Sequence, residues 1–563
     1  MRLDPGGRYH FWAAGWMAFL LGALACRGVE SPGFEVANTQ DGVSVRIVLK
    51  NPASNPETRI QWTSDGSQPT AVHGTRWIAG EAPLSFRATT VLRAVAIQGN
   101  QLSPVATRTV LIPRSAVGQR GESLPASWGR HEGKPLPSSY TLAVHPGIPG
   151  ADQPALESAL TALPSISLVV PPEDLWSPTH GIYLHPEETG EGWERTASFE
   201  WFSKSTPDAK PTPIGCGLRI QGGWSRRPEE SPKHSFRLLF RKRYGTAHLR
   251  IPLFGPEPEE FSTLILRGGN NNTWLHPATE ERRRAEYLRD SWMRATYDAL
   301  GHPSARGRFV HLYLNGLYWG IYQATERPDA TFSARVFGGS PADYDSRNSD
   351  KVIAGDEVAW KQLFAVVNPG VHSDAEYERV GQLLDLPSFI DFILVNLYGA
   401  NGDWDRGSNW YATRRRTPAG GYRFLEWDGE RTLEAVADNQ IGTDDDESPM
   451  RLFQRLRKWP PFVKAFSDRA RVVLASGGPL SPEAAVGRYR RLAQELEPAI
   501  AAEAARWGTY RRELAPFRTG PYEVYTRETH WKPEVKRLLN EYFPARTEAL
   551  RRQLTEAGFS VVP

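Results

Sequence analysis

The segment from Val395 to Glu430 constrains this chain more than any other part of its 563 residues. Its pattern predicts the end of a helix, an acidic loop, a β-hairpin and a second acidic turn. The polar residues of the two acidic turns are Asp403, Asp405, Asn409 and Asp428. Carboxylate and carboxamide oxygens suit Mg²⁺ or Mn²⁺. The segment therefore predicts a divalent-metal site with one carboxylate left to orient or deprotonate a hydroxyl group, as phosphoryl transfer requires.

The same acidic loop also fits a purely structural role. Asp403 and Asp405 could cap turns, and Asn409 could satisfy the loop backbone. The order of these residues alone leaves metal binding and turn capping open. The interleaved indoles of Trp404, Trp410 and Trp427 are expected to pack the hairpin, with stacking of one of them on a purine as the alternative.

Lys233 ends a loop that begins with a glycine pair, in G-G-W-S-R-R-P-E-E-S-P-K-H-S-F-R-L. A lysine at the start of a strand can reach nucleotide phosphates, while Arg226 or Arg227 offers a bidentate guanidinium. The alternative is a surface lysine paired with Glu229 or Glu230. Spacing alone favours this alternative, because a lone glycine pair is a weak signal.

Net charge and the absence of known motifs argue against several other functions. Sixty-seven basic and 64 acidic residues give a net charge of +3, so no global field favours nucleic acid as a partner. The chain contains neither H-E-x-x-H nor G-x-S-x-G, and its internal cysteine, Cys216, is expected to be a buried free thiol. Paired carboxylates are numerous enough that residue types leave a glycosidase open. The acidic run at 444–447 is expected to be a solvated loop.

The N-terminus has the pattern of a secretory signal peptide at residues 1–25. Arg2 and Arg8 precede an apolar stretch that ends in Ala23-Leu24-Ala25, an A-x-A cleavage site. Export to the cell envelope or to the outside is therefore expected. Cys26 follows the cleavage site, so a lipid anchor on Cys26 is the alternative to simple secretion.

Three further regions follow the signal peptide. Residues 33–113 alternate polar and apolar positions in short runs, which predicts a small antiparallel β-sandwich. The run I-Q-W-T-S-D-G-S-Q-P-T, followed by T-T-V-L-R-A-V-A, resembles the β-sandwich at the C-terminus of chitobiases and β-hexosaminidases. This likeness implies a spacer or a unit that binds glycan or a cell surface weakly. Residues 114–160 are rich in Gly, Pro and Ser and are expected to be a linker.

The remaining region, 161–560, begins with strands and ends with helices. Strands are expected at Ile166–Val170, Gly217–Gln221, Ser235–Phe240 and Thr263–Leu266, and helices at Thr279–Leu300 and Leu386–Tyr398. Asn315-Gly316 is a strong hairpin signal. The last hundred residues are expected to be mostly helical. The whole chain is therefore predicted to be α+β, with a small β-sandwich before a larger domain that has a helical C-terminal part.

Taken together, the motifs of this larger domain resemble the CotH (spore coat protein H) kinase family. The matching words run in family order from about Leu168 to Glu434, and the helical tail to Phe559 fits as well. These words are S-R-R…P-K-H-S-F-R-L, K-R-Y-G, P-L-F-G, L-I-L-R-G-G-N-N-N, Y-L-R-D-S-W, V-H-L-Y-L-N-G-L-Y-W-G-I-Y, E-R-P-D, N-G-D-W…N-W-Y and E-W-D-G-E.

The resemblance implies an atypical protein-kinase-like fold that uses ATP and a divalent metal to phosphorylate Ser or Thr of exported proteins. By position, Lys233 matches the lysine that contacts phosphate, with Arg226 beside it. Asp403 matches the catalytic aspartate, and Asn409 and Asp428 match the metal-binding pair.

The same resemblance gives roles to two further acidic positions. Glu326 falls at an acidic position after the hairpin, where it is expected to order Lys233. Family members commonly end the second acidic turn D-x-D, whereas Glu430 stands here as the third metal ligand. The loops before Lys233 and between Asp403 and Asn409 are also slightly long. A non-catalytic surface or adhesion protein that keeps the fold is therefore the alternative, and phosphorylation of glycan is a third.

Overall fold

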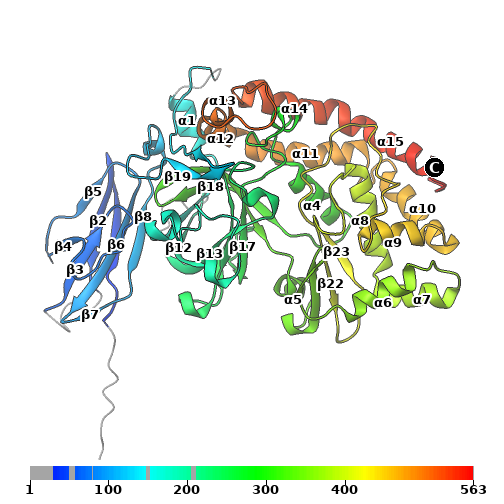
Figure 1. Cartoon of the computed structure of the whole chain (residues 1–563), viewed down its shortest axis with the longest axis horizontal. Coiled ribbons are helices and arrows are strands. Elements are labelled where there is room, and N and C mark those ends of the chain that lie inside the picture. The colour runs from blue at the N-terminus through cyan, green and yellow to red at the C-terminus, as the bar shows by residue number, and fades with distance from the viewer. Residues whose placement is uncertain (1–28, 50–56, 79, 148–152, 205–210, 562–563) are drawn as a thin grey trace, which may run out of the picture.

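The computed structural model describes residues 29–49, 57–78, 80–147, 153–204 and 211–561. The predicted signal peptide at 1–25 and the lipid-attachment alternative at Cys26 lie outside these residues. Within the described part of the chain, none of the helices combines the length and apolarity needed to cross a bilayer. Figure 1 shows a β-rich N-terminal module beside a larger domain, whose strands come first and whose helices come last.

The N-terminal module is built from two small antiparallel sheets, as the alternating pattern predicts. One sheet has the strand order β1-β2-β5, and the other has the order β4-β3-β6-β7 with β8 paired to β6. Val45, Leu92 and Ile60 are among the apolar side chains buried between them. The strands are β1 (Gly33–Thr39), β2 (Gly42–Val48), β3 (Arg59–Thr63), β4 (Thr75–Trp77), β5 (Leu84–Phe86), β6 (Thr90–Gln98), β7 (Gln101–Leu102) and β8 (Ala106–Val110).

The module is held against the larger domain by buried polar contacts from β8. The backbone N–H of Thr109 donates to the carboxylate of Glu200 at 2.7 Å, and its hydroxyl lies 2.8 Å from that of Ser167. Arg108 lies 3.6 Å from the same carboxylate. Because Glu200 is fully buried, these contacts fix the module in one orientation.

The described part of the segment expected to be a linker, residues 114–147 and 153–160, packs against the larger domain. It forms β9 (Ser127–His131), β10 (Lys134–Pro137) and α1 (Gln153–Ala159). Trp128 on β9 is fully buried, with its ring centroid 5.6 Å from that of Trp319 and 5.9 Å from that of Trp507. Glycine and proline here shape turns between packed residues, so their abundance is not a sign of flexibility.

Seven strands close into a barrel with the order β11-β12-β13-β14-β17-β19-β18. Parallel pairing of β11 with β18 completes the circle. Asn315 and Gly316 form the predicted two-residue turn between β18 and β19, both with positive φ. Cys216 on β13 is buried inside the barrel as a free thiol, as expected. The barrel strands are β11 (Ser165–Val169), β12 (Arg195–Phe202), β13 (Ile214–Gln221), β14 (Ser235–Leu239), β17 (Thr263–Arg267), β18 (Gly307–Leu314) and β19 (Leu317–Glu326). Helix α2 (Pro172–Trp176) follows β11, and β15 (Leu249–Ile251) and β16 (Glu259–Phe261) form a separate two-stranded sheet.

The C-terminal part packs helices around a four-stranded sheet with the order β21-β20-β22-β23. The sheet consists of β20 (Tyr344–Asn348), β21 (Lys351–Ala354), β22 (Trp410–Arg415) and β23 (Arg423–Glu426). The helices are α3 (Thr279–Arg283), α4 (Arg289–Ala299), α5 (Ala330–Phe337), α6 (Val358–Val367), α7 (Asp374–Leu383), α8 (Leu386–Gly399), α9 (Pro449–Leu456), α10 (Pro460–Leu474), α11 (Pro482–Leu496), α12 (Ile500–Trp507), α13 (Tyr510–Glu513), α14 (Lys532–Arg537) and α15 (Phe543–Glu556). The α+β class predicted from the sequence is confirmed.

The helix predicted over Thr279–Leu300 is wrong, because two helices occupy this span. Tyr287 has φ +69°, which a continuous helix cannot contain. The side chain of Asn272 accepts hydrogen bonds from the backbone N–H groups of Glu286 and Tyr287, at 3.3 and 2.6 Å. A contact from a distant loop therefore replaces the local helical bonds between α3 and α4.

Candidate functional site

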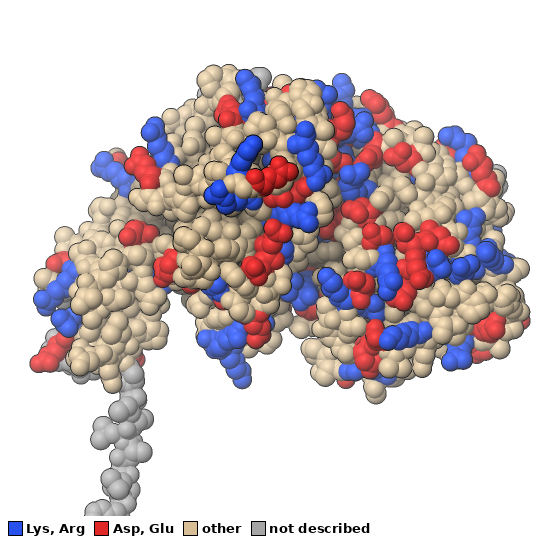
Figure 2. All heavy atoms as spheres, in the orientation of Figure 1, with Lys and Arg blue, Asp and Glu red and all other residues tan. Residues whose placement is uncertain are grey.

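A cavity of about 630 Å³ lies between the barrel and the four-stranded sheet. Figure 2 shows the molecule indented between these two parts. One side of the cavity comes from β13, β14 and β17, and the other comes from β20, β21 and the acidic turns. The residues that line the cavity include Trp224, Arg226, Arg237, Arg267, Asn270, Asn271, Arg327, Asp403, Asn409, Trp427, Asp428 and Glu430.

The acidic loop between α8 and β22 is shaped by its own polar side chains. Asn401 accepts a hydrogen bond from the backbone N–H of Asp403 at 3.1 Å. Asn409 has φ +70°, and its amide group donates to the backbone carbonyl of Asp403. Asp405 accepts from the backbone of Gly407 and from Ser408, so it builds the turn. The cavity therefore receives Asp403 and Asn409, while Asp405 has the structural role.

Asp403 stands in an environment that favours its protonated form. Burial raises the pKa of Asp403, and the neighbouring carboxylates of Asp428 and Asp405 raise it further. A carboxylate with a raised pKa is a stronger base than an ordinary aspartate. The influence of Asp428 also means that the two acidic turns meet at this cavity, although they lie 25 positions apart in the chain.

The second acidic turn follows β23 and is tied to the neighbouring elements. Asp428 has φ +62° and pairs with the guanidinium of Arg267 at the end of β17. The backbone N–H of Gly429 donates to Asp290 on α4 at 3.0 Å. The side chain of Asp428 stays 37% exposed, so it can still reach a ligand in the cavity.

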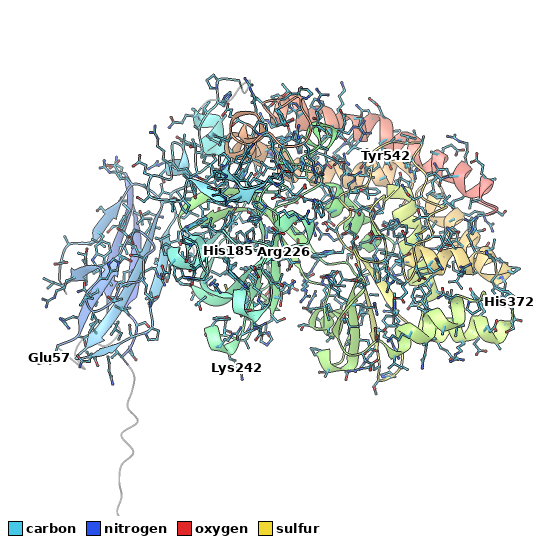
Figure 3. All side chains as sticks on the ribbon, viewed as in Figure 1. Glu57, His185, Arg226, Lys242, His372 and Tyr542 are labelled. Carbon is cyan, nitrogen blue, oxygen red and sulfur yellow. The ribbon has the colours of Figure 1, made fainter. Side chains whose placement is uncertain are left out.

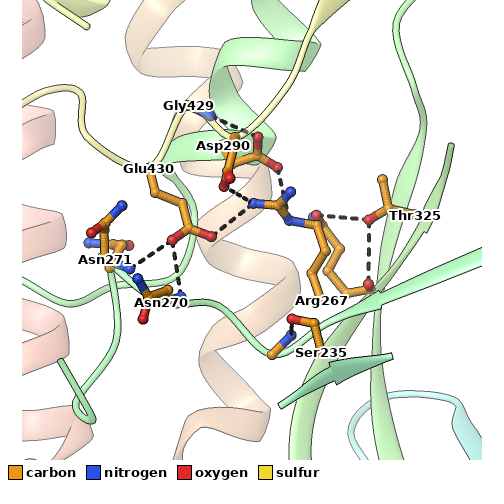
Figure 4. A network of polar contacts seen from close by, with 12 residues as sticks. Ser235, Arg267, Asn270, Asn271, Asp290, Thr325, Gly429 and Glu430 are labelled. Carbon is orange, nitrogen blue, oxygen red and sulfur yellow. Dashed lines mark hydrogen bonds and ion pairs between the residues drawn. The ribbon is translucent and has the colours of Figure 1, made fainter. Parts of the chain in front are cut away.

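Glu430 is turned away from solvent, and its two carboxylate oxygens already have partners. One oxygen accepts from Arg267 at 2.9 Å, and the other accepts from the backbone N–H groups of Asn270 and Asn271 at 3.0 and 2.8 Å. Figure 4 shows these bonds converging on its carboxylate. Burial, together with the neighbouring carboxylate of Asp428, raises the pKa of Glu430.

The barrel side of the cavity presents arginines. The Arg237 guanidinium donates to Gln221 at 2.8 Å and has no ion pair with a carboxylate among the described residues. Burial lowers the pKa of Arg237 to about 10, with the charge of Arg327 as the next cause. In the part of the chain that the structure describes, Arg327 pairs with the carboxylate of Asp329 at 4.0 Å. Guanidinium groups that lack close counter-charges in a cavity suit the oxygens of phosphate.

Arg226 lines the same cavity, but most of its donors are bound to the protein. Its guanidinium donates to the backbone carbonyls of Pro186, Glu188, Ile220 and Gly222. Figure 3 labels Arg226 near His185, where this loop meets the barrel. The contacts make Arg226 a support for the loop before Lys233 and leave few of its N–H donors free for a ligand.

Lys233 lies beneath the cavity and is not one of its lining residues. Its ammonium group donates to the Glu503 carboxylate and to the backbone carbonyl of Ile321, each at 2.6 Å. The side chains of Lys233 and Glu503 are each 1% exposed. The surface lysine expected as the alternative is therefore wrong, and contact of Lys233 with phosphate stays a prediction.

The expected pairing of Glu326 with Lys233 is also wrong. Glu326 ends β19, five residues beyond Ile321, and accepts from Arg306 at 2.9 and 3.0 Å and from Arg335. These two arginines hold Glu326 at the rim of the barrel. Glu503 on α12 provides the carboxylate that orders Lys233, because the C-terminal helices fold back against β19.

The polar groups of the acidic turns fit a hard divalent cation in type. Asp403, Asn409 and Asp428 offer two carboxylates and a carboxamide, the donors that Mg²⁺ or Mn²⁺ prefers. Within the described residues, no group of three or more His, Cys, Asp and Glu side chains is arranged to hold a metal ion. Two carboxylates and an amide would fit a cation that keeps several waters and also binds substrate phosphates.

The tryptophans of the acidic segment pack as expected. Trp404 and Trp410 are buried against Phe392 and Trp360, and Trp427 lies beneath the guanidinium of Arg267 at 4.9 Å. Trp427 also lines the cavity. A further indole, Trp224, is 53% exposed at the cavity and stacks with Arg227.

Three lining arginines, at positions 237, 267 and 327, were not expected from the sequence. Each falls within a motif word, in S-F-R-L, L-I-L-R-G-G or E-R-P-D. The alternation of Phe236, Arg237 and Leu238 along β14 could have placed Arg237 on the outer face of the barrel. The pairing of β14 with β17 then brings Arg237 opposite Ile265, two residues from Arg267.

The comparisons with known proteins agree with these motifs. A family model described as CotH kinase protein matches residues 218–550, which is more than half of the chain. A model described as Fn3 associated matches residues 47–110, within the N-terminal module. A search of curated proteins found no match. The likeness of the N-terminal module to chitobiase modules stays a prediction.

Proposed function

Because the chain belongs to the CotH kinase protein family, we propose that it transfers the γ-phosphate of ATP to Ser or Thr hydroxyls of proteins outside the cytoplasm. One observation carries the proposal. The cavity has arginines without close counter-charges on its barrel side and the carboxylates of Asp403 and Asp428 on the other. This arrangement suits a polyanion that must meet a hydroxyl group and a divalent cation in one place.

The residues have separate tasks in this proposal. Arg237 and Arg327 neutralise the non-bridging oxygens of the phosphates. Asp403 accepts a hydrogen bond from the acceptor hydroxyl and takes its proton as the new O–P bond forms. The bond between the γ-phosphorus and the bridging oxygen breaks, and ADP leaves with that oxygen. A divalent cation bound to Asn409 and Asp428 would supply further neutralisation of the phosphate charge.

Export rests on the sequence pattern of residues 1–25, which places the acceptor among secreted or envelope proteins. Lipid attachment at Cys26 would keep the protein at a membrane surface. Weak binding of glycan or of a cell surface by the N-terminal module would add to that location. Each of these points remains part of the proposal.

A labelling experiment tests the proposed activity. The mature protein is incubated with γ-labelled ATP and Mn²⁺ or Mg²⁺, alone and with a casein-like acceptor, beside Asp403→Asn and Asp428→Ala. We expect phosphoprotein with the natural sequence and with Asp405→Asn, whose side chain builds the turn and is not among the cavity-lining residues, and a loss of 100-fold or more in the first two variants. Equal label on Asp428→Ala, or none on any protein with either metal, would contradict the proposal and favour the non-catalytic alternative. Label on saccharide alone would favour glycan as the acceptor.

A further inference from the structure

The carboxylate of Glu430 joins three separate segments of the chain. We propose, building on the phosphoryl transfer proposed above, that Glu430 is a positioning residue and not a metal ligand. Its carboxylate ties the second acidic turn to the Gly268–Asn272 loop and to Arg267, and so sets the orientation in which Asp428 meets the cavity. The Glu430 bridge is defined as the bonds from this carboxylate to Arg267, Asn270 and Asn271.

The bridge uses nearly all of the hydrogen-bonding capacity of Glu430. A carboxylate accepts about four hydrogen bonds, and three charged or backbone donors already occupy this one. Its side chain is 8% exposed, whereas that of Asp428, two residues earlier, is 37% exposed. Both residues line the cavity, but the carboxylate oxygens of Glu430 are bonded to the protein, as Figure 4 shows, whereas the side chain of Asp428 is the more exposed of the two.

The turn that carries Glu430 is packed tightly against α4, which opposes a shift that would let a shorter side chain make the same bonds. Gly429 lies so close to α4 that an added Cβ would stand 2.8 Å from Cγ of Met293. Its backbone N–H is also bonded to Asp290, which in turn is held by Arg294 at 2.8 Å. An aspartate at position 430 would fall short by one methylene, about 1.5 Å, and could not reach the loop amides and Arg267 together.

The same bonds give Arg267 its place above Trp427. Its guanidinium contacts Asp428, Glu430 and, at 3.8 Å, Asp290. A side chain with three carboxylate partners is fixed in direction. Glu430 thus acts on the cavity through Arg267 and through the loop, without touching the ligand.

Amide exchange tests the bridge directly. Hydrogen exchange at Asn270 and Asn271 is measured in the natural protein with and without Mn²⁺ and a non-hydrolysable ATP analogue. We expect both amides to stay protected when the metal is added. Faster exchange on adding Mn²⁺ would mean that the carboxylate leaves the loop to bind metal, and the proposal would be wrong. This measurement decides the role of Glu430 even if the protein transfers no phosphate.

Two substitutions at Glu430 distinguish the positioning role from the metal-ligand role, because the two roles predict opposite rankings of their kcat values. Glu430→Gln keeps the length of the side chain, and Glu430→Asp keeps the charge. The bridge predicts that the two amides exchange at least tenfold faster in Glu430→Asp than in Glu430→Gln, with kcat lower in the aspartate variant. A metal ligand predicts higher kcat in Glu430→Asp and equal amide protection. Glu434→Gln, which removes a carboxylate paired with Arg431 in the same turn, should leave both amides unchanged.

Discussion

Lys233 and Glu503 lie 270 positions apart and form an ion pair at 2.6 Å that is almost completely buried. Lys233 lies just before β14 and Glu503 lies on α12, so the pair connects the barrel to the C-terminal helices. Burial lowers the pKa of Lys233, and the Glu503 carboxylate opposes this change. The pair therefore depends on both members being present.

Removal of one member of this pair should be costly. Lys233→Met is expected to lower the free energy of unfolding by about 3–5 kcal/mol, because Glu503 would remain buried without a counter-charge. Urea denaturation of Lys233→Met, Glu503→Gln and the double variant measures the coupling. We expect the double variant to lose less than the sum of the single losses. Additive losses would show that the two side chains do not depend on each other.

The packing of segment 114–160 can be tested at Trp128. Trp128→Ala is expected to lower the free energy of unfolding by about 3–5 kcal/mol, since it removes a fully buried indole. Trp224→Ala is the matched control because its indole is half exposed, and about 0.5 kcal/mol is expected there. Equal losses of stability in the two variants would mean that the contacts of Trp128 do not hold this segment against the larger domain.

Arg237 should contribute to nucleotide binding. Arg237→Gln is expected to raise the KM for ATP about tenfold, because a hydrogen bond from a charged donor contributes about 1.5–3 kcal/mol. Steady-state kinetics at varied ATP concentration measures the change. Arg219→Gln is the control, since Arg219 is on β13 and pairs with Glu194 at 2.6 Å. A larger effect at Arg219 than at Arg237 would refute the role given to the cavity arginines.

The pH profile should report the environment of Asp403. Its pKa is raised by burial and by the carboxylates of Asp428 and Asp405, and the deprotonated form is the one that accepts a proton. The acidic limb of kcat/KM should therefore lie at higher pH than an ordinary aspartate would give. Asp405→Asn removes one of the neighbouring charges, so the limb should move to lower pH. An unchanged limb in that variant would argue against Asp403 as the base.

Stability should also vary with pH at the contact between the module and the barrel. Burial raises the pKa of Glu200 from 4.5 to about 7, so the folded protein binds this proton more tightly than the unfolded chain. The resulting contribution, about 3 kcal/mol, is fully present below pH 4.5 and is lost as pH rises through 7. Thermal denaturation from pH 4 to pH 8 should show this decline, and Glu200→Gln should flatten it. The same slope in Glu200→Gln would assign the decline to another group.

Local patterns predicted much of the fold because they depend on neighbouring residues. The Asn315-Gly316 turn and the helix predicted at Leu386–Tyr398, which is α8, follow from preferences that depend mainly on local sequence. The break between α3 and α4 could not be predicted in this way. It depends on the side chain of Asn272, which lies 14 and 15 positions before Glu286 and Tyr287 and outside either helix.

The residues of the candidate site also separate into those that local sequence predicts and those that depend on the whole fold. Asp403, Asn409 and Asp428 were predicted together because one hairpin carries them, and the structure places all three on one cavity. Glu503 could not be found as the partner of Lys233, because nothing local joins α12 to β14. The cavity arginines were missed for a similar reason, since the distance between β14 and β17 depends on the order of strands in the barrel.

The closing pair of the barrel has a kinetic consequence. Ser165 on β11 pairs with His311 on β18, so the circle is completed only after the intervening strands have been arranged. Contacts between such distant positions slow folding, because the entropy of closing a long loop is lost before the contacts form. During synthesis, β18 must therefore leave the ribosome before β11 can pair with it. The cavity lies between the barrel and the four-stranded sheet, so it is complete only after the barrel has closed.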